Sequence, residues 1–170
     1  MKEGFYKQYG ANVRQDGIIE LSANNYVVFF GFGKDDENDE FGYNWRKNYD
    51  HRPSVDEIRS DIEDLVNSQT DEKILSGFVW KGFPVWLSSE NQFNFKFIYD
   101  LALQKEGATL PVTFKIGQDS QGEPIYHTFD DMEEFSDFIM SAFGFIMQTV
   151  QEGWNIKDNV DYNQYDLGND

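Results

Sequence analysis

The acidic run from Asp35 to Glu40 holds the residue types best suited to bind a metal ion. Carboxylates at positions 35, 37 and 39 offer the hard oxygen ligands that calcium prefers. An EF-hand loop also needs a glycine at its sixth position and a glutamate at its twelfth, and this run supplies neither. We therefore predict a solvated loop without specific metal affinity, and we expect the protein to use no cofactor.

The two histidines, His51 and His127, are the other candidate metal ligands or general bases. No H-x-x-x-H or comparable spacing supports a shared site, although a zinc site of two histidines and an acid stays open as an alternative. His127 stands between Tyr126 and Thr128 in an alternating pattern, so we interpret it as a strand-face residue. The chain has no cysteine, which excludes disulfides, thiol catalysis and zinc-thiolate sites.

Catalytic patterns are weak throughout the chain. With 31 acidic residues, some carboxylate pair will lie at any chosen distance, so the two carboxylates and aromatic walls that a glycosidase needs are not informative here. Ser88 and Ser89 do not lie in a G-x-S-x-G elbow. The run Gly31-Phe32-Gly33 is not followed by a predicted helix, so it is no phosphate cradle. We predict that the protein is not an enzyme.

The formal charge of −17 restricts the class of partner. Nucleic-acid binding needs clustered Lys and Arg, and anionic membranes repel an acidic chain, so we expect neither partner. The charge favours solubility, and the alternative is an acidic face that docks a basic protein. The apolar-rich run from Phe135 to Val150 is too short to span a bilayer, and no signal-peptide core opens the chain. The absence of cysteine fits synthesis in a reducing bacterial host cytoplasm.

The N-terminal third, residues 1–52, reads as a small β-unit. Residues 1–16 are polar with scattered aromatics and predict an extended arm. Short strands are predicted over Ile18–Leu21 and over Phe41–Tyr49, where aromatic and polar residues alternate. The segment Tyr26–Gly33 is apolar on both faces, which predicts a central strand or one covered by a partner chain.

A hairpin and a helix start follow each other between Gly77 and Leu101. Two aromatic arms flank a turn at Lys81-Gly82, where glycine supplies the positive φ that a tight turn needs. We expect Trp80 and Trp86 on these arms to pack against the neighbouring helices. Ser88 or Ser89 provides an N-cap, with Gln92 in the capping-box position. The next helix is predicted to present one apolar face, made of Phe93, Phe97 and Leu101.

Helices are predicted over residues 55–67, 90–105 and 130–153, and two strands over Val112–Ile116 and Ile125–Phe129. Ser54 and Asp130 are the expected N-caps of the first and third helices. The strands and helices do not alternate as βαβ units, so we predict an α+β fold: an N-terminal β-unit followed by a compact domain of short hairpins and three helices, residues 53–153. Residues 154–170 predict an extended, acidic and aromatic C-terminal tail.

The stretch GFVWKGFPVWLSSENQFNFK, residues 77–96, resembles the core of an uncharacterised phage-tail domain family found in tail-fibre and tail-fibre-assembly proteins. The later run LPVTFK, residues 110–115, and a second strand, IYHTF, residues 125–129, follow in the family's order, so the resemblance covers roughly residues 55–155. The N-terminal segment resembles the start of small proteins of Bacteroides-type gut phages. The resemblance implies a virion location and carries no catalytic residues.

Aromatic residues near both chain ends predict a protein interface, because Trp and Tyr are enriched at binding hot spots and extended termini can add strands to a neighbour. Core packing and carbohydrate stacking are the alternatives. We expect a non-enzymatic, tail-associated docking module that contacts other virion or tail proteins and itself. A tail-fibre assembly chaperone is the first alternative, and a carbohydrate-binding or hydrolytic module at the fibre tip is the second. The predicted interface residues are Tyr26, Phe29, Phe32, Phe41, Tyr43, Trp45, Tyr49, Trp154, Tyr162 and Tyr165.

Overall fold

The computed structural model describes residues 4–168, which form three antiparallel sheets and three α-helices. This confirms the predicted α+β class. The chain divides into two compact units: unit 1 holds residues up to Val66 and from Ile156 onward, and unit 2 holds Asn67–Asn155. The elements are β1 (Tyr6–Ala11), β2 (Gly17–Ser22), β3 (Asn25–Gly33), β4 (Gly42–Tyr49), α1 (Val55–Ser76), β5 (Phe78–Trp80), β6 (Phe83–Val85), α2 (Ser89–Gln104), β7 (Val112–Gln118), β8 (Pro124–Phe129), α3 (Met132–Asp158) and the 3-10 helix η1 (Tyr162–Tyr165).

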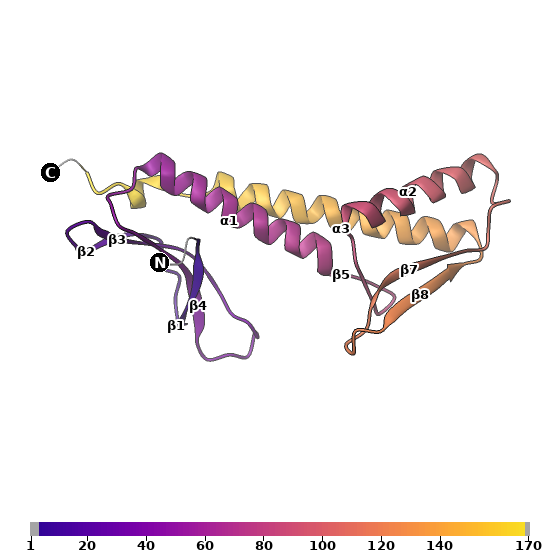
Figure 1. Cartoon of the computed structure of the whole chain (residues 1–170), viewed down its shortest axis with the longest axis horizontal. Coiled ribbons are helices and arrows are strands. Elements are labelled where there is room, and N and C mark those ends of the chain that lie inside the picture. Colours follow the sequence, from indigo (N-terminus) through magenta and orange to yellow (C-terminus); the bar gives the residue numbers. More distant parts are fainter. Residues whose placement is uncertain (1–3, 169–170) are drawn as a thin grey trace. The chain divides into compact units, whose positions relative to one another are not determined.

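Unit 1 is built on a four-stranded antiparallel sheet in the order β1-β4-β3-β2 (Figure 1). Strand β3 pairs with β2 on one side and with β4 on the other, which confirms that this apolar segment is central. Strand β1 pairs with β4, so part of the predicted arm of residues 1–16 is a sheet strand. Residues 1–3 of that arm lie outside the described residues.

The first turns of α1 cover one face of this sheet. Ile58, Ile62 and Val66 recur every four residues and therefore line one side of the helix. They pack against the inward-facing residues of β3, among them Val28 and Phe30. Ser54 caps the helix as predicted, because its Oγ accepts a hydrogen bond from the Glu57 N–H at 3.1 Å. The first boundary between the two units falls within α1, after Val66, whereas the sequence predicts a domain boundary at residues 52/53.

The C-terminal segment belongs to the fold of unit 1. The predicted extended tail of residues 154–170 is wrong, because α3 continues to Asp158 and η1 follows at Tyr162–Tyr165. Tyr165 is only 2% exposed, and its hydroxyl donates to the carbonyl oxygen of Phe29 at 3.1 Å. The burial of this ring inside unit 1 is what orders the segment. Residues 169 and 170 lie outside the described residues.

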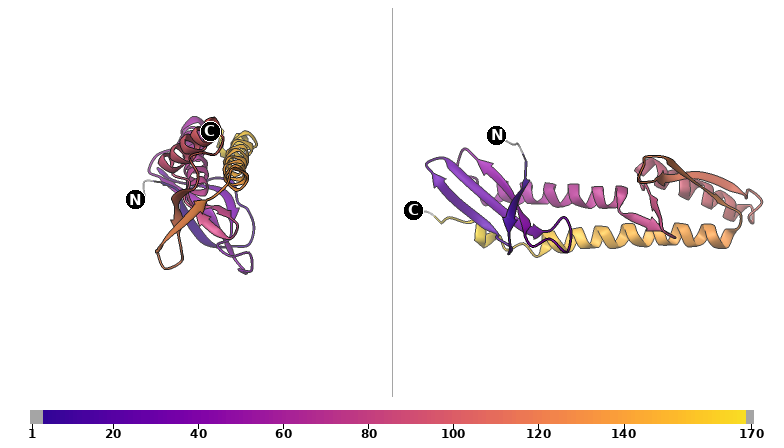
Figure 2. Two further views of the ribbon diagram at one scale, coloured as in Figure 1. Left: turned by 90° about the vertical axis from the view of Figure 1, so that its right-hand side faces the viewer. Right: turned by 90° about the horizontal axis from the view of Figure 1, so that it is seen from below.

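Unit 2 surrounds an aromatic core. Trp80 on β5 is buried, its indole Nε1 donates to the Asp137 carboxylate at 2.9 Å, and its ring meets Phe138 edge-on. The turn at Lys81-Gly82 has positive φ at both residues, as predicted for a tight hairpin. Helix α2 lies along the first half of α3 (Figure 2). The core consists of Phe78, Trp80, Val85, Leu87, Phe95, Ile116, Phe129, Phe135, Phe138 and Ala142.

Helix α2 buries a different face from the predicted one. Phe95 and Ala102 enter the core, whereas Phe93 and Phe97 are exposed and stack on each other at 6.1 Å between ring centroids. The sequence offers two apolar stripes on this helix, and the core of unit 2 buries the one that contains Phe95. Ser88 is the N-cap, since its Oγ accepts from the Asn91 N–H.

Two other helix bounds differ from the predictions. Helix α1 runs nine residues beyond the predicted end at position 67, to Ser76, and within unit 2 its last turn pairs Lys73 with Glu152. Ile74 in these added turns packs against the core of unit 2, but the polar run from Asn67 to Lys73 interrupts the apolar period, so a periodicity argument ends the helix early. Asp131, rather than Asp130, caps α3 through a hydrogen bond from the Glu134 N–H.

Candidate binding groove around Trp86

Trp86 follows β6 and is 45% exposed, whereas Trp80 on the other arm of the hairpin is buried. Its side chain borders two hollows of about 480 and 260 Å³. Gly117 and Gln118 on β7 line both hollows as well, so the two form one groove with the indole in its middle. We call this the Trp86 groove; its other lining residues are Ser76, Pro84, Val85, Ser88, Asn91, Lys115 and Asp119.

The groove exists because β7 approaches the β6 strand very closely. The backbone N–H of Trp86 donates to the carbonyl oxygen of Ile116 at 2.8 Å. At Gly117 a Cβ atom would lie 2.1 Å from the carbonyl oxygen of Pro84, so only glycine fits there. The β7–β8 register also shifts between Lys115 and Gly117, which is a β-bulge. The bulge and the glycine together bring the β7 backbone against the backbone of Pro84 and Trp86.

The polar side chains of the groove come from the α2 N-terminus and from β7. Asn91 is held in place, because its Nδ2 donates to the Trp86 carbonyl oxygen at 2.8 Å and its backbone N–H donates to Ser88 Oγ. The amide oxygen of Asn91 is then the acceptor that it can present to a ligand. Lys115 and Gln118 are exposed on the β7 side. This lining combines a flat apolar ring with amide, hydroxyl and ammonium groups, which suits binding rather than bond breaking.

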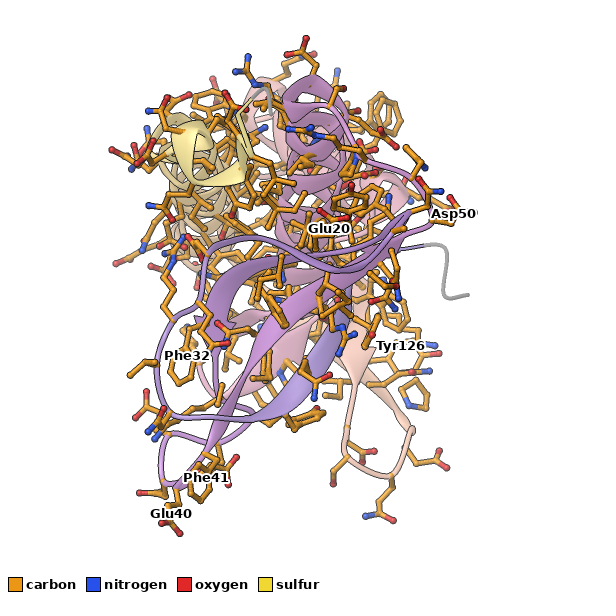
Figure 3. The ribbon with its side chains drawn as sticks, turned by 90° about the vertical axis from the view of Figure 1, so that its left-hand side faces the viewer. Glu20, Phe32, Glu40, Phe41, Asp50 and Tyr126 are labelled. Atoms are coloured by element: carbon orange, nitrogen blue, oxygen red, sulfur yellow. The ribbon has the colours of Figure 1, made fainter. Side chains whose placement is uncertain are left out.

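The predicted interface residues divide into buried and accessible ones. The burial of Tyr26, Tyr49 and Tyr165 in the core of unit 1 corrects their prediction as surface contacts: the sheet and η1 use these rings for packing. Phe41 is exposed near the tip of the β3–β4 loop beside Glu40, and Phe32 is exposed on β3 (Figure 3). Trp154 is also exposed, and the partly exposed members are Phe29, Tyr43, Trp45 and Tyr162.

Two of the predicted interface residues lie in a small aromatic cluster on unit 1. Tyr43 contacts Trp45 and Tyr9 edge-on, with ring centroids 5.5 and 5.6 Å apart. The ammonium of Lys7 lies 4.3 Å from the Tyr43 ring centroid and pairs with Asp35. The Asp35 interaction, chiefly a hydrogen bond, raises the pKa of Lys7 and lowers that of Asp35. The Lys7 ammonium and the Asp35 carboxylate are thus paired with each other within unit 1.

The candidate metal ligands are engaged in hydrogen bonds. Asp35 accepts from Lys7 and Tyr9, and Asp36 accepts from the backbone and side chain of Asn38. Across residues 4–168 no three His, Cys, Asp or Glu side chains gather closely enough to hold a metal ion. The absence of metal affinity in the Asp35–Glu40 loop stays a prediction. No helix in the same range is long and apolar enough to cross a bilayer.

The two histidines lie in different units. In unit 1, His51 contacts Asp50 and Glu57, and these carboxylates raise its pKa. In unit 2, His127 is a β8 strand residue, as predicted, and its Nε2 lies 3.4 Å from Glu134. A hydrogen bond from Lys81, with a smaller contribution from His127, lowers the pKa of the Glu134 carboxyl. His51 is thus explained by its contacts with neighbouring carboxylates, and His127 by its place on β8, where its ring packs edge-on against Trp80.

Sequence reasoning missed the Trp86 groove. Trp86 was predicted to pack on the helices, and that prediction is wrong because its ring faces solvent. The same indole chemistry serves burial and binding, so residue type does not separate the two. A signal was present in the alternation of the arm: Val85 and Leu87 are the buried neighbours of Trp86, which leaves position 86 on the outer side. The contribution of Gly117 and Gln118 depends on a contact between distant segments.

Comparison with protein-family models, with curated proteins and with solved structures finds no match to this chain.

Proposed function

We propose that this protein is a non-enzymatic docking module of a phage or prophage particle, associated with the tail, and that the Trp86 groove receives a segment of a neighbouring virion protein. The docking role is carried by one observation, the half-exposed indole of Trp86 between two hollows. The phage context is supported by the resemblance of residues 55–155 to tail-fibre and assembly proteins. The protein would be made in the host cytoplasm and would act in the virion.

The groove suits a peptide segment with an apolar side chain. A tryptophan that can be desolvated in a pocket contributes strongly to protein binding, especially when polar residues surround it. Asn91 and Gln118 carry amides that can pair with the backbone of a bound segment. Lys115 is the cation of the larger hollow, and it favours a segment with a carboxylate near the apolar anchor.

Photo-crosslinking in infected or prophage-induced cells tests the proposal. A photoreactive amino acid replaces Gln118, and the adducts are identified by mass spectrometry in cells and in purified particles. We expect an adduct with a particle protein that Trp86→Ala abolishes. The matched control is Phe83→Ala, because Phe83 is 42% exposed on the same hairpin but does not line the groove. An adduct that survives Trp86→Ala, or the absence of any particle-protein adduct, would refute docking at this groove.

A tail-fibre assembly chaperone remains the first alternative. It would use the same groove but would leave the particle after assembly. Quantitative mass spectrometry of purified particles separates the two, because a structural protein is present in fixed stoichiometry and a chaperone is absent.

Carbohydrate binding is the second alternative, and the lining of the groove is compatible with it as well. Sugars stack their apolar faces on indole rings and hydrogen-bond to amides and hydroxyls, and Ser88, Asn91 and Gln118 supply such groups beside Trp86. A glycan array followed by calorimetry tests this reading. Saturable binding of one glycan that is lost in Trp86→Ala and kept in Phe83→Ala would favour it over protein docking.

A further inference from the structure

Helix α3 carries a second apolar stripe that unit 2 does not cover. Met140, Phe143, Met147 and Trp154 are all exposed, although other apolar residues of the same helix fill the core. Residues 140, 147 and 154 recur every seven positions, and Phe143 follows Met140 by three. This spacing is the a/d pattern of a helix that packs against another helix. We call these four residues, with Gly144, the α3 stripe.

From Met140 to Met147 the stripe is electrically neutral in a strongly acidic chain, and Trp154 lies two residues beyond Glu152. The sequence has no charged residue between Asp137 and Glu152, which corresponds to about 22 Å of helix at 1.5 Å per residue. The chain as a whole carries a formal charge of −17, so two copies repel each other over most of their surface. A basic partner would be drawn to acidic regions instead. A neutral apolar helix face is where two copies of this chain can meet.

Gly144 gives the stripe a notch. Glycine in a helix interior is unfavourable relative to alanine, so its presence at mid-helix calls for a reason. Nothing lies within 4 Å of the place where its Cβ would be, so packing within the chain does not require it. Its neighbour Phe143 is a large exposed ring. A second helix could place its own Phe143 over this notch.

We propose that the α3 stripe is a self-association surface, on which two copies pair their α3 helices antiparallel about a two-fold axis between Phe143 and Gly144. In this register Phe143 of each copy opposes Gly144 of the other, and Met140 opposes Met147. The Phe143 ring then fills the space at Gly144, and each contact occurs twice, as in any isologous interface. Asp137 would oppose Val150, Glu152 would oppose Phe135 and Glu133 would oppose Trp154, so no acidic residue meets another acidic residue. A parallel pair would align every acidic residue of α3 with itself.

Sedimentation equilibrium of the full chain tests the association. With about 400 Å² of apolar surface per copy, estimated from four half-exposed large side chains, the pair is weak, so it is measured up to several hundred micromolar. We expect the mass to rise with concentration from 19.9 kDa towards twice that value. Phe143→Glu should weaken the association at least about tenfold while circular dichroism stays unchanged. Phe93→Ser on α2 and Trp86→Ala in the groove are the matched controls and should leave it intact.

The results separate this proposal from docking at the Trp86 groove. A mass that stays at 19.9 kDa at every concentration, or that Phe143→Glu does not lower, overturns the α3 pairing. Loss of association in Phe93→Ser or Trp86→Ala, with none in Phe143→Glu, would move the interface to α2 or to the groove and would also overturn it. A constant mass, or a mass that Phe143→Glu does not lower, leaves docking of a particle protein at the groove untouched. Loss of association in Trp86→Ala would instead assign the groove to self-association.

Disulfide trapping tests the orientation of the two α3 helices. The chain has no native cysteine, so only the introduced cysteines can form a disulfide. In the antiparallel register, position 147 of one copy lies about 10 Å along the axis from position 147 of the other, beyond the reach of a disulfide. Met140→Cys alone and Met147→Cys alone should therefore stay uncrosslinked, whereas their mixture should give a covalent dimer. Crosslinking of each single variant with itself would show a parallel pair and overturn the register.

Discussion

At the scale of single residues, exposure decides what each tryptophan of the hairpin does. Trp80 is 4% exposed and hydrogen-bonded to Asp137, whereas Trp86 is half exposed in the groove. We expect Trp80→Ala to lower the free energy of unfolding by about 3–5 kcal/mol, as for other buried aromatics. Trp86→Ala should lower it by roughly half as much, because nearly half of its surface, 45%, is already in contact with water. Urea denaturation of both variants measures the difference.

An equal loss of stability in the two variants would mean that Trp86 is a core residue and that the groove is filled by its ring. The docking proposal would then lose its anchor. A small loss in Trp86→Ala would keep that variant usable in the binding experiments, because it would stay folded.

The second residue-scale prediction concerns His51. Its hydrogen bonds with Asp50, and to a smaller extent with Glu57, raise the pKa of His51 above the ordinary value of 6.5. A histidine with a raised pKa in the folded state contributes stability that is present below pH 6.5 and is lost as the pH rises through the folded-state value. We expect an NMR titration to give a His51 midpoint above 6.5, and Asp50→Asn and Glu57→Gln each to lower it. His127→Gln assigns the signal, since the chain has only two histidines.

A His51 midpoint at or below 6.5, or one unmoved by both substitutions, would show that the carboxylates do not contact the ring in solution. The contribution to stability is small, because the ring is exposed and its ion pairs are screened by solvent.

At the scale of elements, Gly117 on β7 and Gly144 on α3 differ in whether the surrounding structure leaves room for a side chain. An alanine at Gly117 would force β7 away from β6, because its Cβ would lie 2.1 Å from a backbone carbonyl oxygen. We expect Gly117→Ala to destabilise the protein by about 1–3 kcal/mol, a typical cost of overpacking. Gly144→Ala, in open space on α3, should stabilise it by about 0.5–1 kcal/mol through helix propensity. Thermal unfolding at low protein concentration, where the chain is monomeric, measures both.

If Gly117→Ala were neutral, the close approach of β7 to the Trp86 arm would be wrong, and with it the shape of the groove. Gly144→Ala has a second consequence that a purely local effect would not produce. It should stabilise the monomer and weaken self-association together, because the added methyl group fills the notch that receives Phe143.

At the scale of the whole molecule, unit 1 joins the two ends of the chain. Tyr165 is buried with the residues of β3 and α1, and its hydroxyl donates a hydrogen bond to the carbonyl oxygen of Phe29. We expect Tyr165→Ala to destabilise unit 1 by about 3–5 kcal/mol. Tyr162→Ala should cost less, because Tyr162 is only partly buried. Hydrogen exchange of the β3 amides, read by mass spectrometry, should show faster exchange in Tyr165→Ala than in Tyr162→Ala.

The same burial bears on truncation. Deleting residues 154–170 removes a core ring of unit 1, so the truncated protein should expose the sheet face that Tyr165 covers. A truncated protein with unchanged exchange of the β3 amides would show that η1 is dispensable and that α1 alone covers the sheet.

The sequence by itself determined the local features of this protein. The α+β class, the Lys81-Gly82 turn, the Ser54 cap and the central position of β3 all follow from short-range chemistry: positive φ at glycine, capping hydroxyls and apolar runs. These signals lie within a few residues of the structure that they specify. The phage-tail resemblance also came from the sequence, and it stays a proposal.

Only the tertiary structure decided which apolar surfaces are covered. Helix α2 had two apolar stripes, α3 had one wide apolar face, and Trp86 and Tyr165 each suited core or surface equally well by residue type. Burial depends on contacts between segments far apart in the chain, such as β6 with β7 and η1 with β3. The hydrophobic effect is non-directional and scales with area, so burial of either apolar surface would be favourable. The packing of the other elements leaves room for only one of them.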